Sequence, residues 1–315
     1  MRINPAIILA LTLCSSAALA QTPSLLKIVV PFPAGGSPDI FARLMGEDIK
    51  GAGGPSVTVE NRPGASGIIG TEVVARAAPD GGTIGVVAPS FLIASAVRKR
   101  SFEPFNSFEH VCRVLDSPLV VVVNSASTYK VYDDLVAAAR AQPGALMMGA
   151  NGPATTQQIV AEMVKKASKV DMTFVPFNGS APAVTALLGN HTNVAVANYA
   201  EVKAFIDSGA LRVLLVASPQ RIPALPDAPT AREKGLGFDL TNWFAVVATG
   251  KTPKPALDAI EMYTRKALSN AAIIDKLAQV QLTPSVLCGE AFTAFLKEQN
   301  ETIATIVREA GIKDE

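Results

Sequence analysis

The sequence has little charge of either sign. Charged residues make up 17% of the 315 residues, below the roughly 25% of an average soluble protein, and 28 basic residues face 27 acidic ones. Without a basic excess the chain has little to neutralise phosphates, which excludes nucleic-acid binding of the usual kind. The 49% of hydrophobic residues also exclude a disordered chain, because they supply ample apolar surface to bury.

Motifs of metal-dependent, nucleotide-dependent and hydrolytic enzymes are missing as well. The only two histidines, His110 and His191, form no metal-spaced cluster. The glycines at 64, 67 and 70 have the wrong spacing for a dinucleotide-binding fingerprint, and neither a P-loop nor a G-x-S-x-G elbow occurs. The sequence therefore predicts no enzyme, no cofactor and no metal. A secreted hydrolase is the less favoured alternative, because it needs a base placed beside its nucleophile.

The first twenty residues have the pattern of a secretory signal peptide. Arg2 precedes an apolar run at 6–13, and Ala18-Leu19-Ala20 has the form of a cleavage site. This predicts cleavage after Ala20 and a location in a periplasm. The apolar run is too short to span a membrane, and the uncharged stretch 181–200 contains too many polar groups, so the mature protein is not expected to be membrane-embedded.

Two cysteines, Cys112 and Cys288, would remain after the signal peptide is removed. An oxidising compartment permits a disulfide between them, but a sequence does not show whether their Cα atoms come close enough. Two buried free thiols are the favoured interpretation, and a disulfide is the alternative.

Hydrophobic periodicity predicts that strands and helices alternate along the mature chain. Runs of β-branched residues predict strands at 26–31, 56–60, 83–87, 119–124, 145–149, 172–176, 194–197, 213–217 and 243–248. Helical spacing predicts helices at 39–49, 68–78, 131–141, 157–167, 255–270, 273–279 and 291–310. A further helix is expected after the strand at 172–176 and the loop that follows it. This alternation indicates an α/β protein with helices on both faces of its sheets. The most purely apolar strands, 119–124 and 243–248, are predicted to cross between two similar lobes.

Four Gly-rich turns are the candidate ligand site. Each follows a predicted strand and precedes a predicted helix, the place where open α/β sheets bind ligands. The N–H groups at a helix start lack partners and suit anions, so no Arg or Lys is required. The turns lie at 32–39, 61–67, 150–156 and 178–182. Gly and Pro could simply make tight turns, but four at corresponding places favour a ligand cleft.

The sequence resembles a known family in five ordered motifs. These are PFPAGGSPDIFAR, VENRPGASGIIG, VPFNGSAPAVTALLG, RIPALPDAPTAREKG and NWFAVVATGKTPK. In order and spacing they are similar to the substrate-binding proteins of tripartite tricarboxylate transporters, the Bug family, over nearly all of the mature chain. The resemblance implies a type II periplasmic-binding-protein fold, two α/β lobes with a ligand cleft between them, and hinge closure over a small organic carboxylate. It also implies permease subunits in the membrane as partners.

The predicted domain organisation follows from this fold. Residues 21–123 and 246–315 would form lobe 1, and residues 124–245 would form lobe 2. The mature protein is expected to be a monomer. A ligand sensor that docks on a signalling receptor would have the same fold, and it stays open as an alternative function.

The resemblance also assigns ligand-binding residues, position by position. In lobe 1 two turns would hold the ligand carboxylate largely through backbone groups, with one aromatic wall and one serine facing the cleft. These residues are Phe32, Ala34, Gly35, Gly36, Ser37, Asp39, Gly64, Ala65, Ser66, Gly67 and Ser90. In lobe 2 they are Ala150, Asn151, Thr155, Asn178 and Asn198.

Lobe 2 departs from the family pattern, in which an Asp is frequent at the position of Asn198. Asn198 removes a negative charge that could pair with a ligand ammonium. A keto, hydroxy, aromatic or dicarboxylic acid is therefore expected to bind better than aspartate or glutamate. The alternative is that Asn198 faces a neighbouring strand and has no role in ligand selection.

Overall fold

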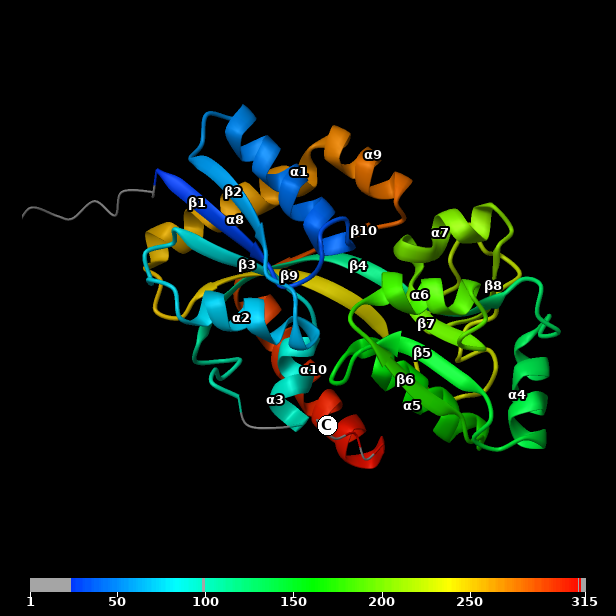
Figure 1. Cartoon of the computed structure of the whole chain (residues 1–315). Coiled ribbons are helices and arrows are strands. Elements are labelled where there is room, and N and C mark those ends of the chain that lie inside the picture. Colours follow the sequence, from blue (N-terminus) through cyan, green and yellow to red (C-terminus); the bar gives the residue numbers. More distant parts are fainter. Residues whose placement is uncertain (1–23, 98–99, 311, 313–315) are drawn as a thin grey trace, which may run out of the picture.

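The computed structural model describes residues 24–97, 100–310 and 312 (Figure 1). The predicted signal peptide lies outside these residues. The strands are β1 (Leu25–Val30), β2 (Ser56–Asn61), β3 (Thr83–Val87), β4 (Phe108–Asn124), β5 (Met147–Asn151), β6 (Thr173–Phe177), β7 (Val194–Asn198), β8 (Leu211–Val216), β9 (Thr241–Thr249) and β10 (Thr283–Cys288). The α-helices are α1 (Ser37–Gly51), α2 (Ile68–Ala75), α3 (Ser90–Val97), α4 (Tyr132–Ala141), α5 (Thr156–Ser168), α6 (Ser180–Leu188), α7 (Tyr199–Asp207), α8 (Lys254–Ser269), α9 (Ala271–Gln279) and α10 (Gly289–Ala310). Among these helices none is long and apolar enough to cross a membrane.

The first sheet is built on β1. This strand pairs in parallel with β2 on one side and with β3 on the other, as the strand–helix alternation predicts. Ile28, Val29 and Val30 are fully buried, because helices cover both faces of the sheet. β9 extends the sheet antiparallel to β3, and β4 and then β10 follow.

The second sheet contains β5, β6, β7 and β8 together with the end of β4. β5 pairs in parallel with β6 and with β7. β7 and β8 both pair antiparallel with the last residues of β4. The strand order along the main path is β2-β1-β3-β9-β4-β7-β5-β6.

β4 is a single strand of 17 residues that takes part in both sheets. Its residues 108–118 pair with β9 and partly with β10, and its residues 119–124 pair with β7 and β8. Periodicity predicted only the second part, because Glu109, Arg113 and Asp116 interrupt the apolar pattern of the first. β4 therefore carries the chain from one sheet to the other (Figure 1). The prediction that 243–248 also crosses was wrong, because β9 pairs only with β3 and with residues 108–118 of β4, all in the first sheet.

Helices cover both faces of each sheet, which confirms the predicted α/β class. In the first sheet α1, α8 and α9 share one hydrophobic cluster, and α2, α3 and α10 share another. In the second sheet α4 and α5 pack in one cluster and α6 and α7 in another. Figure 1 shows the C-terminal helices α8, α9 and α10 returning to the sheet of β1. The site lies at the ends of the strands, which these helices do not cover.

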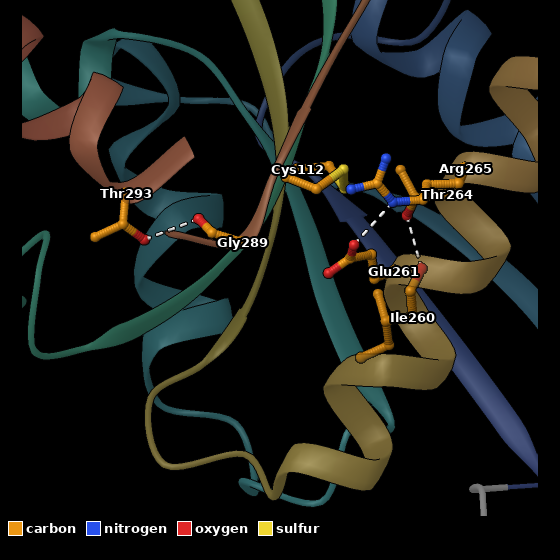
Figure 2. Close-up of a disulfide and its surroundings, with 8 residues drawn as sticks. Cys112, Ile260, Glu261, Thr264, Arg265, Gly289 and Thr293 are labelled. Carbon is orange, nitrogen blue, oxygen red and sulfur yellow. Dashed lines mark hydrogen bonds and ion pairs between the residues drawn. A yellow bond between two sulfur atoms is a disulfide. The ribbon is translucent and has the colours of Figure 1, made fainter. Parts of the chain in front are cut away.

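A disulfide joins Cys112 of β4 to Cys288 of β10 (Figure 2). The preference for two free thiols was therefore wrong. β10 pairs antiparallel with β4, and the two cysteines stand directly opposite each other in its register. The cysteines lie 176 residues apart in the chain. Because periodicity did not predict β10, their approach could not be predicted either.

Three elements of the described chain were not predicted: α3, α7 and β10. The α3 sequence is apolar on all sides, so it has no amphipathic period to detect. α7 follows β7 directly, and Asn198 is both the last residue of the strand and the N-cap residue of the helix. β10 is partly exposed and contains Pro284, so its pattern is not that of a core strand.

Candidate functional site

The first Gly-rich turn leads from β1 into α1, and Asp39 holds it. Gly36 is the N-cap residue of α1, and Gly35 has a φ of +82°, which favours glycine. The Asp39 carboxylate accepts hydrogen bonds from Arg43 Nε at 3.0 Å, from the Gly35 N–H at 2.8 Å and from Asn61 Nδ2 at 2.9 Å. Burial raises the pKa of Asp39, but these bonds together hold it below its ordinary value. Asp39 is therefore ionised, and its hydrogen bond with the Gly35 N–H stabilises the first Gly-rich turn.

The second turn has an unusual backbone. Four consecutive residues, 64–67, all have positive φ. A Cβ at Gly67 would come within 3.1 Å of the Phe32 ring, so this position combines a left-handed backbone with a close approach. The hydroxyl of Ser66 donates a hydrogen bond of 2.6 Å to the carbonyl oxygen of Pro153. The second turn of the chain therefore touches the third.

The third turn ends at Thr155, the N-cap residue of α5. Its Oγ1 accepts from the Gln158 N–H at 3.3 Å and donates to the Gly152 carbonyl at 2.9 Å. In the fourth turn Gly179 caps α6 with a φ of +111°. A fifth helix start follows at Asn198, the N-cap of α7.

A cavity of about 470 Å³ lies where these turns meet. Its lining includes the N-cap residues of four helices: Gly36 of α1, Thr155 of α5, Gly179 of α6 and Asn198 of α7. Backbone N–H groups in a first helical turn lack intrahelical partners and carry partial positive charge. The cavity therefore offers an anion several helix ends at once, and its size suits a small molecule.

Most of the predicted site residues line this cavity or the one beside it. The first cavity is lined by Phe32, Ala34, Gly35, Gly36, Ser90, Asn151, Thr155, Asn178 and Asn198. A second cavity, of about 580 Å³, is lined by the predicted residues Gly64, Ala65, Ser66 and Gly67. The two cavities share Phe32, Asn151 and Asn178 as lining residues, so they adjoin.

Three predicted residues line neither of these cavities. Ser37 and Asp39 are buried in the first turn of α1, and Asp39 acts there through its hydrogen bond to Gly35. Ala150 is fully buried in the hydrophobic cluster of the second sheet. Direct ligand contacts by these three residues stay a prediction.

Glu201, Asn242 and Phe244 also line the first cavity and were missed by the sequence analysis. The spacing Asn198-x-x-Glu201 is that of a helix capping box, a signal that would have placed Glu201 in the first turn of a helix. Asn242 and Phe244 lie two residues apart on β9, so they share one face of that strand.

Glu201 is the one ionisable side chain among the described residues that line the first cavity. Burial raises the pKa of its carboxyl, and hydrogen bonding by Ser180 and Asn198 offsets this only in part. The second cavity has Arg100 in its lining. The Nε of Arg100 donates to the Ala94 carbonyl at 3.2 Å.

Groups for catalysis or metal binding do not gather in the part of the chain that the structure describes. No set of three His, Cys, Asp or Glu residues there could hold a metal ion. His110 contacts the Pro104 carbonyl through Nε2 at 2.9 Å, and burial lowers the pKa of this histidine. His191 is exposed. The Ser66 hydroxyl is bonded to a carbonyl oxygen rather than to a base.

Two β-sheets with helices on both faces are joined by a long strand, and helix N-termini surround a cavity. This arrangement is that of the periplasmic binding proteins. The structure of the periplasmic binding protein BugD has a TM-score of 0.85 and 30% identity, and the match covers 92% of this chain and 98% of that one. The structure of R. palustris Rpa4515 with adipate has a TM-score of 0.84 and 27% identity, with coverage of 92% and 98%. The predicted type II periplasmic-binding-protein fold is therefore confirmed.

The family follows from the sequence comparisons. The model of the family "Tripartite tricarboxylate transporter family receptor" matches residues 41–312. Protein BugT of Bordetella pertussis is 31% identical over 292 residues, which are 91% of this chain and 90% of that relative. The chain belongs to this receptor family, as its motifs predicted. The family is one of periplasmic binding proteins, which fits a location outside the cytoplasm.

Proposed function

We propose that this protein captures a small organic carboxylate in the cavity between its lobes and delivers it to permease subunits in the membrane. The observation that carries the proposal is the convergence of four helix N-caps on one cavity. Together they supply N–H donors and partial positive charge without a lysine or arginine in the described lining. A structure of a relative with adipate, at 27% identity, supports the carboxylate as ligand.

The action proposed is binding with hinge closure rather than catalysis. The proposed lobe 1 comprises residues 21–123 and 246–315, and lobe 2 comprises residues 124–245. A division into two lobes is supported by the change of pairing partners along β4, which falls between Pro118 and Leu119. The hydrogen bond from Ser66 to Pro153 runs between the proposed lobes, so it would form only when they are close.

The proposed location is the periplasm, with cleavage of the signal peptide after Ala20. The mature protein would act as a monomer that docks on its permease. Intact-mass measurement of the exported protein tests the cleavage site. A mass that includes residues 1–20, or a lipid on Cys14, contradicts it.

Ligand identity is tested by mass spectrometry of whatever co-purifies with the protein, followed by calorimetry with a panel of carboxylates. Each carboxylate is paired with its neutral amide as the matched control. We expect carboxylates to bind and to stabilise the fold, by about 2.7 kcal/mol at 100 times the dissociation constant. Equal binding of the neutral amides, or binding of no carboxylate, would overturn the proposal.

A further inference from the structure

Glu201 places a carboxyl group on the wall of the first cavity. It lies in the first turn of α7, and its Oε1 accepts a hydrogen bond of 3.1 Å from Asn198 Nδ2. The other oxygen, Oε2, is buried and makes no hydrogen bond to a described residue. A buried acceptor without a donor is costly, so this oxygen calls for an explanation.

The capping-box spacing does not account for the contact of Oε1. An N3 glutamate in such a box accepts from the backbone N–H of its N-cap residue, whereas Glu201 Oε1 accepts from the side-chain Nδ2 of Asn198. The Asn198 side chain makes no capping hydrogen bond to α7. Hydrogen bonding by the Ser180 hydroxyl of α6 offsets part of the effect of burial on the pKa of the Glu201 carboxyl.

A chain of hydrogen bonds fixes the orientation of the carboxyl. Thr156 Oγ1 donates to Asn242 Oδ1 at 3.1 Å. Asn242 Nδ2 donates to Asn198 Oδ1 at 3.1 Å, and Asn198 Nδ2 donates to Glu201 Oε1. All four side chains line the cavity. Each amide is committed at both ends, so Asn198 serves to orient Glu201, and the Glu201 carboxyl is the end of the chain that is left for a ligand.

The charges around the cavity determine what the Glu201 carboxyl can accept. No Lys, Arg or His is among the described lining residues, so a ligand with a second carboxylate would meet the carboxyl of Glu201 without a fixed cation between them. A protonated amine or a carboxamide would instead donate to the Glu201 carboxyl. A Cβ built on Gly36 would lie 4.0 Å from Glu201 Oε1, so the carboxyl stands next to the first Gly-rich turn.

We propose that Glu201 is the specificity-determining side chain of this cavity, and that the ligand is a carboxylate that also carries a nitrogen donor, either a protonated amine or a carboxamide. The inference rests on the proposed function, because it refines the class of carboxylate. It replaces the expectation drawn from Asn198 alone, whose premise was that the second lobe offers no negative group.

Calorimetry with matched ligands tests the inference on the mature wild-type protein. The probes are succinate, aspartate and succinamate, then glutarate, glutamate and glutaramate, then adipate, 2-aminoadipate and adipamate. In each set the members share a chain length: the amino acid keeps both carboxylates and adds an ammonium group, whereas the monoamide replaces one carboxylate by a carboxamide. We expect the tightest nitrogen-bearing member to bind about 10-fold or more tighter than its dicarboxylate, the scale of one hydrogen bond to a charged group.

The variant Glu201→Gln separates the charge of the carboxyl group from its contact with Asn198. Glutamine keeps a side-chain oxygen that can accept the hydrogen bond from Asn198 Nδ2. It lacks the negative charge and presents an amide that can donate to a second carboxylate. We expect this variant to lose or reverse the preference. Glu261→Gln, which makes the same charge change on the partly exposed face of α8, is the control and should keep it.

The outcomes distinguish this inference from the proposed function. Tighter binding of succinate, glutarate and adipate than of their nitrogen-bearing counterparts by the wild-type protein overturns the inference. An unchanged preference in a folded Glu201→Gln variant also overturns it, and either result leaves carboxylate binding intact. Binding of no carboxylate by the wild-type protein overturns both. If Glu201→Gln does not fold, the wild-type preference alone decides.

Discussion

The hydroxyl of Ser66 and the carbonyl oxygen of Pro153 lie 2.6 Å apart, which ties the second Gly-rich turn to the third. The two residues belong to different proposed lobes and are 87 positions apart in the chain. The contact therefore stabilises the arrangement in which the turns surround the cavities. A neutral hydrogen bond of this kind contributes about 1 kcal/mol.

Replacement of Ser66 by alanine is expected to loosen the closed arrangement. Loss of about 1 kcal/mol from the closed state should weaken ligand binding about 5-fold, because the closed population falls before the ligand binds. Solution scattering of the ligand-free protein should show a larger particle for Ser66→Ala than for the wild type. The matched control is Ser269→Ala. It removes a hydroxyl that donates a hydrogen bond to the backbone carbonyl of Lys266 at an exposed position of α8. Unchanged scattering and affinity in Ser66→Ala would show that this bond does not link the lobes in solution.

Valine at Gly35 or at Gly67 is expected to abolish ligand stabilisation while the protein still folds. Both glycines have positive φ, and at Gly67 the new side chain would also meet the Phe32 ring. The loss should reach the full 2.7 kcal/mol or so that a ligand supplies at 100 times its dissociation constant. The measurement is the free energy of unfolding with and without ligand.

Gly53→Val is the control for the glycine variants. Gly53 has a φ of +73° and open space around it, like Gly35, but it lies beyond the end of α1 and lines neither cavity. It should suffer similar backbone strain and keep the ligand effect. Normal affinity in both Gly35→Val and Gly67→Val would remove the two turns from the binding site.

Removal of the disulfide is expected to lower stability without changing ligand affinity. The bridge from Cys112 to Cys288 closes a long loop, and such bridges contribute roughly 2–5 kcal/mol, mainly through the unfolded chain. Neither cysteine lines the two cavities of the site. The double variant Cys112→Ala/Cys288→Ala should unfold at lower denaturant concentration, as should the reduced wild type. Identical midpoints for oxidised and reduced wild type would contradict the expected contribution.

Local pattern predicted most of the fold and much of the site, and it failed where distant segments decide the outcome. β1 and its turn could be predicted because β-branched residues, glycines and a helix start follow one another within a few positions. The pairing of β10 with β4 depends on the return of α8 and α9 to the first sheet, which no local pattern contains. The disulfide was missed for the same reason.

Glu201 shows the same limit within the site. Its spacing from Asn198 was visible in the sequence, but its orientation also depends on Asn242, which is 44 residues away from Asn198. Thr156, which fixes Asn242, is 86 residues away from it. Reading Asn198 alone therefore suggested a neutral cavity wall, whereas the folded chain brings a carboxyl to that wall.

Glu201 is also expected to make the stability of the ligand-free protein depend on pH. Burial holds the pKa of its carboxyl above the ordinary value of about 4.3 that it regains on unfolding. The native state therefore keeps this proton at pH values where the unfolded state has lost it, and stability falls as the pH rises from about 4.3 through the raised native pKa. The other titratable groups on α7 are Tyr199, Lys203 and Asp207.

Glu201→Gln removes this titration, so its free energy of unfolding should rise relative to wild type as the pH increases from about 4 to 8, and the difference should level off above the native pKa. Denaturant titrations of both proteins across this range measure the difference, and Glu261→Gln corrects for a general change of charge. Asp39 adds a signal of opposite sign in both proteins, because its native pKa is lowered and its stabilisation is lost only as the pH falls below about 4. It cancels when the two curves are subtracted. A difference that stays constant from pH 4 to 8 would show that the Glu201 carboxyl meets solvent as freely in the folded chain as in the unfolded one.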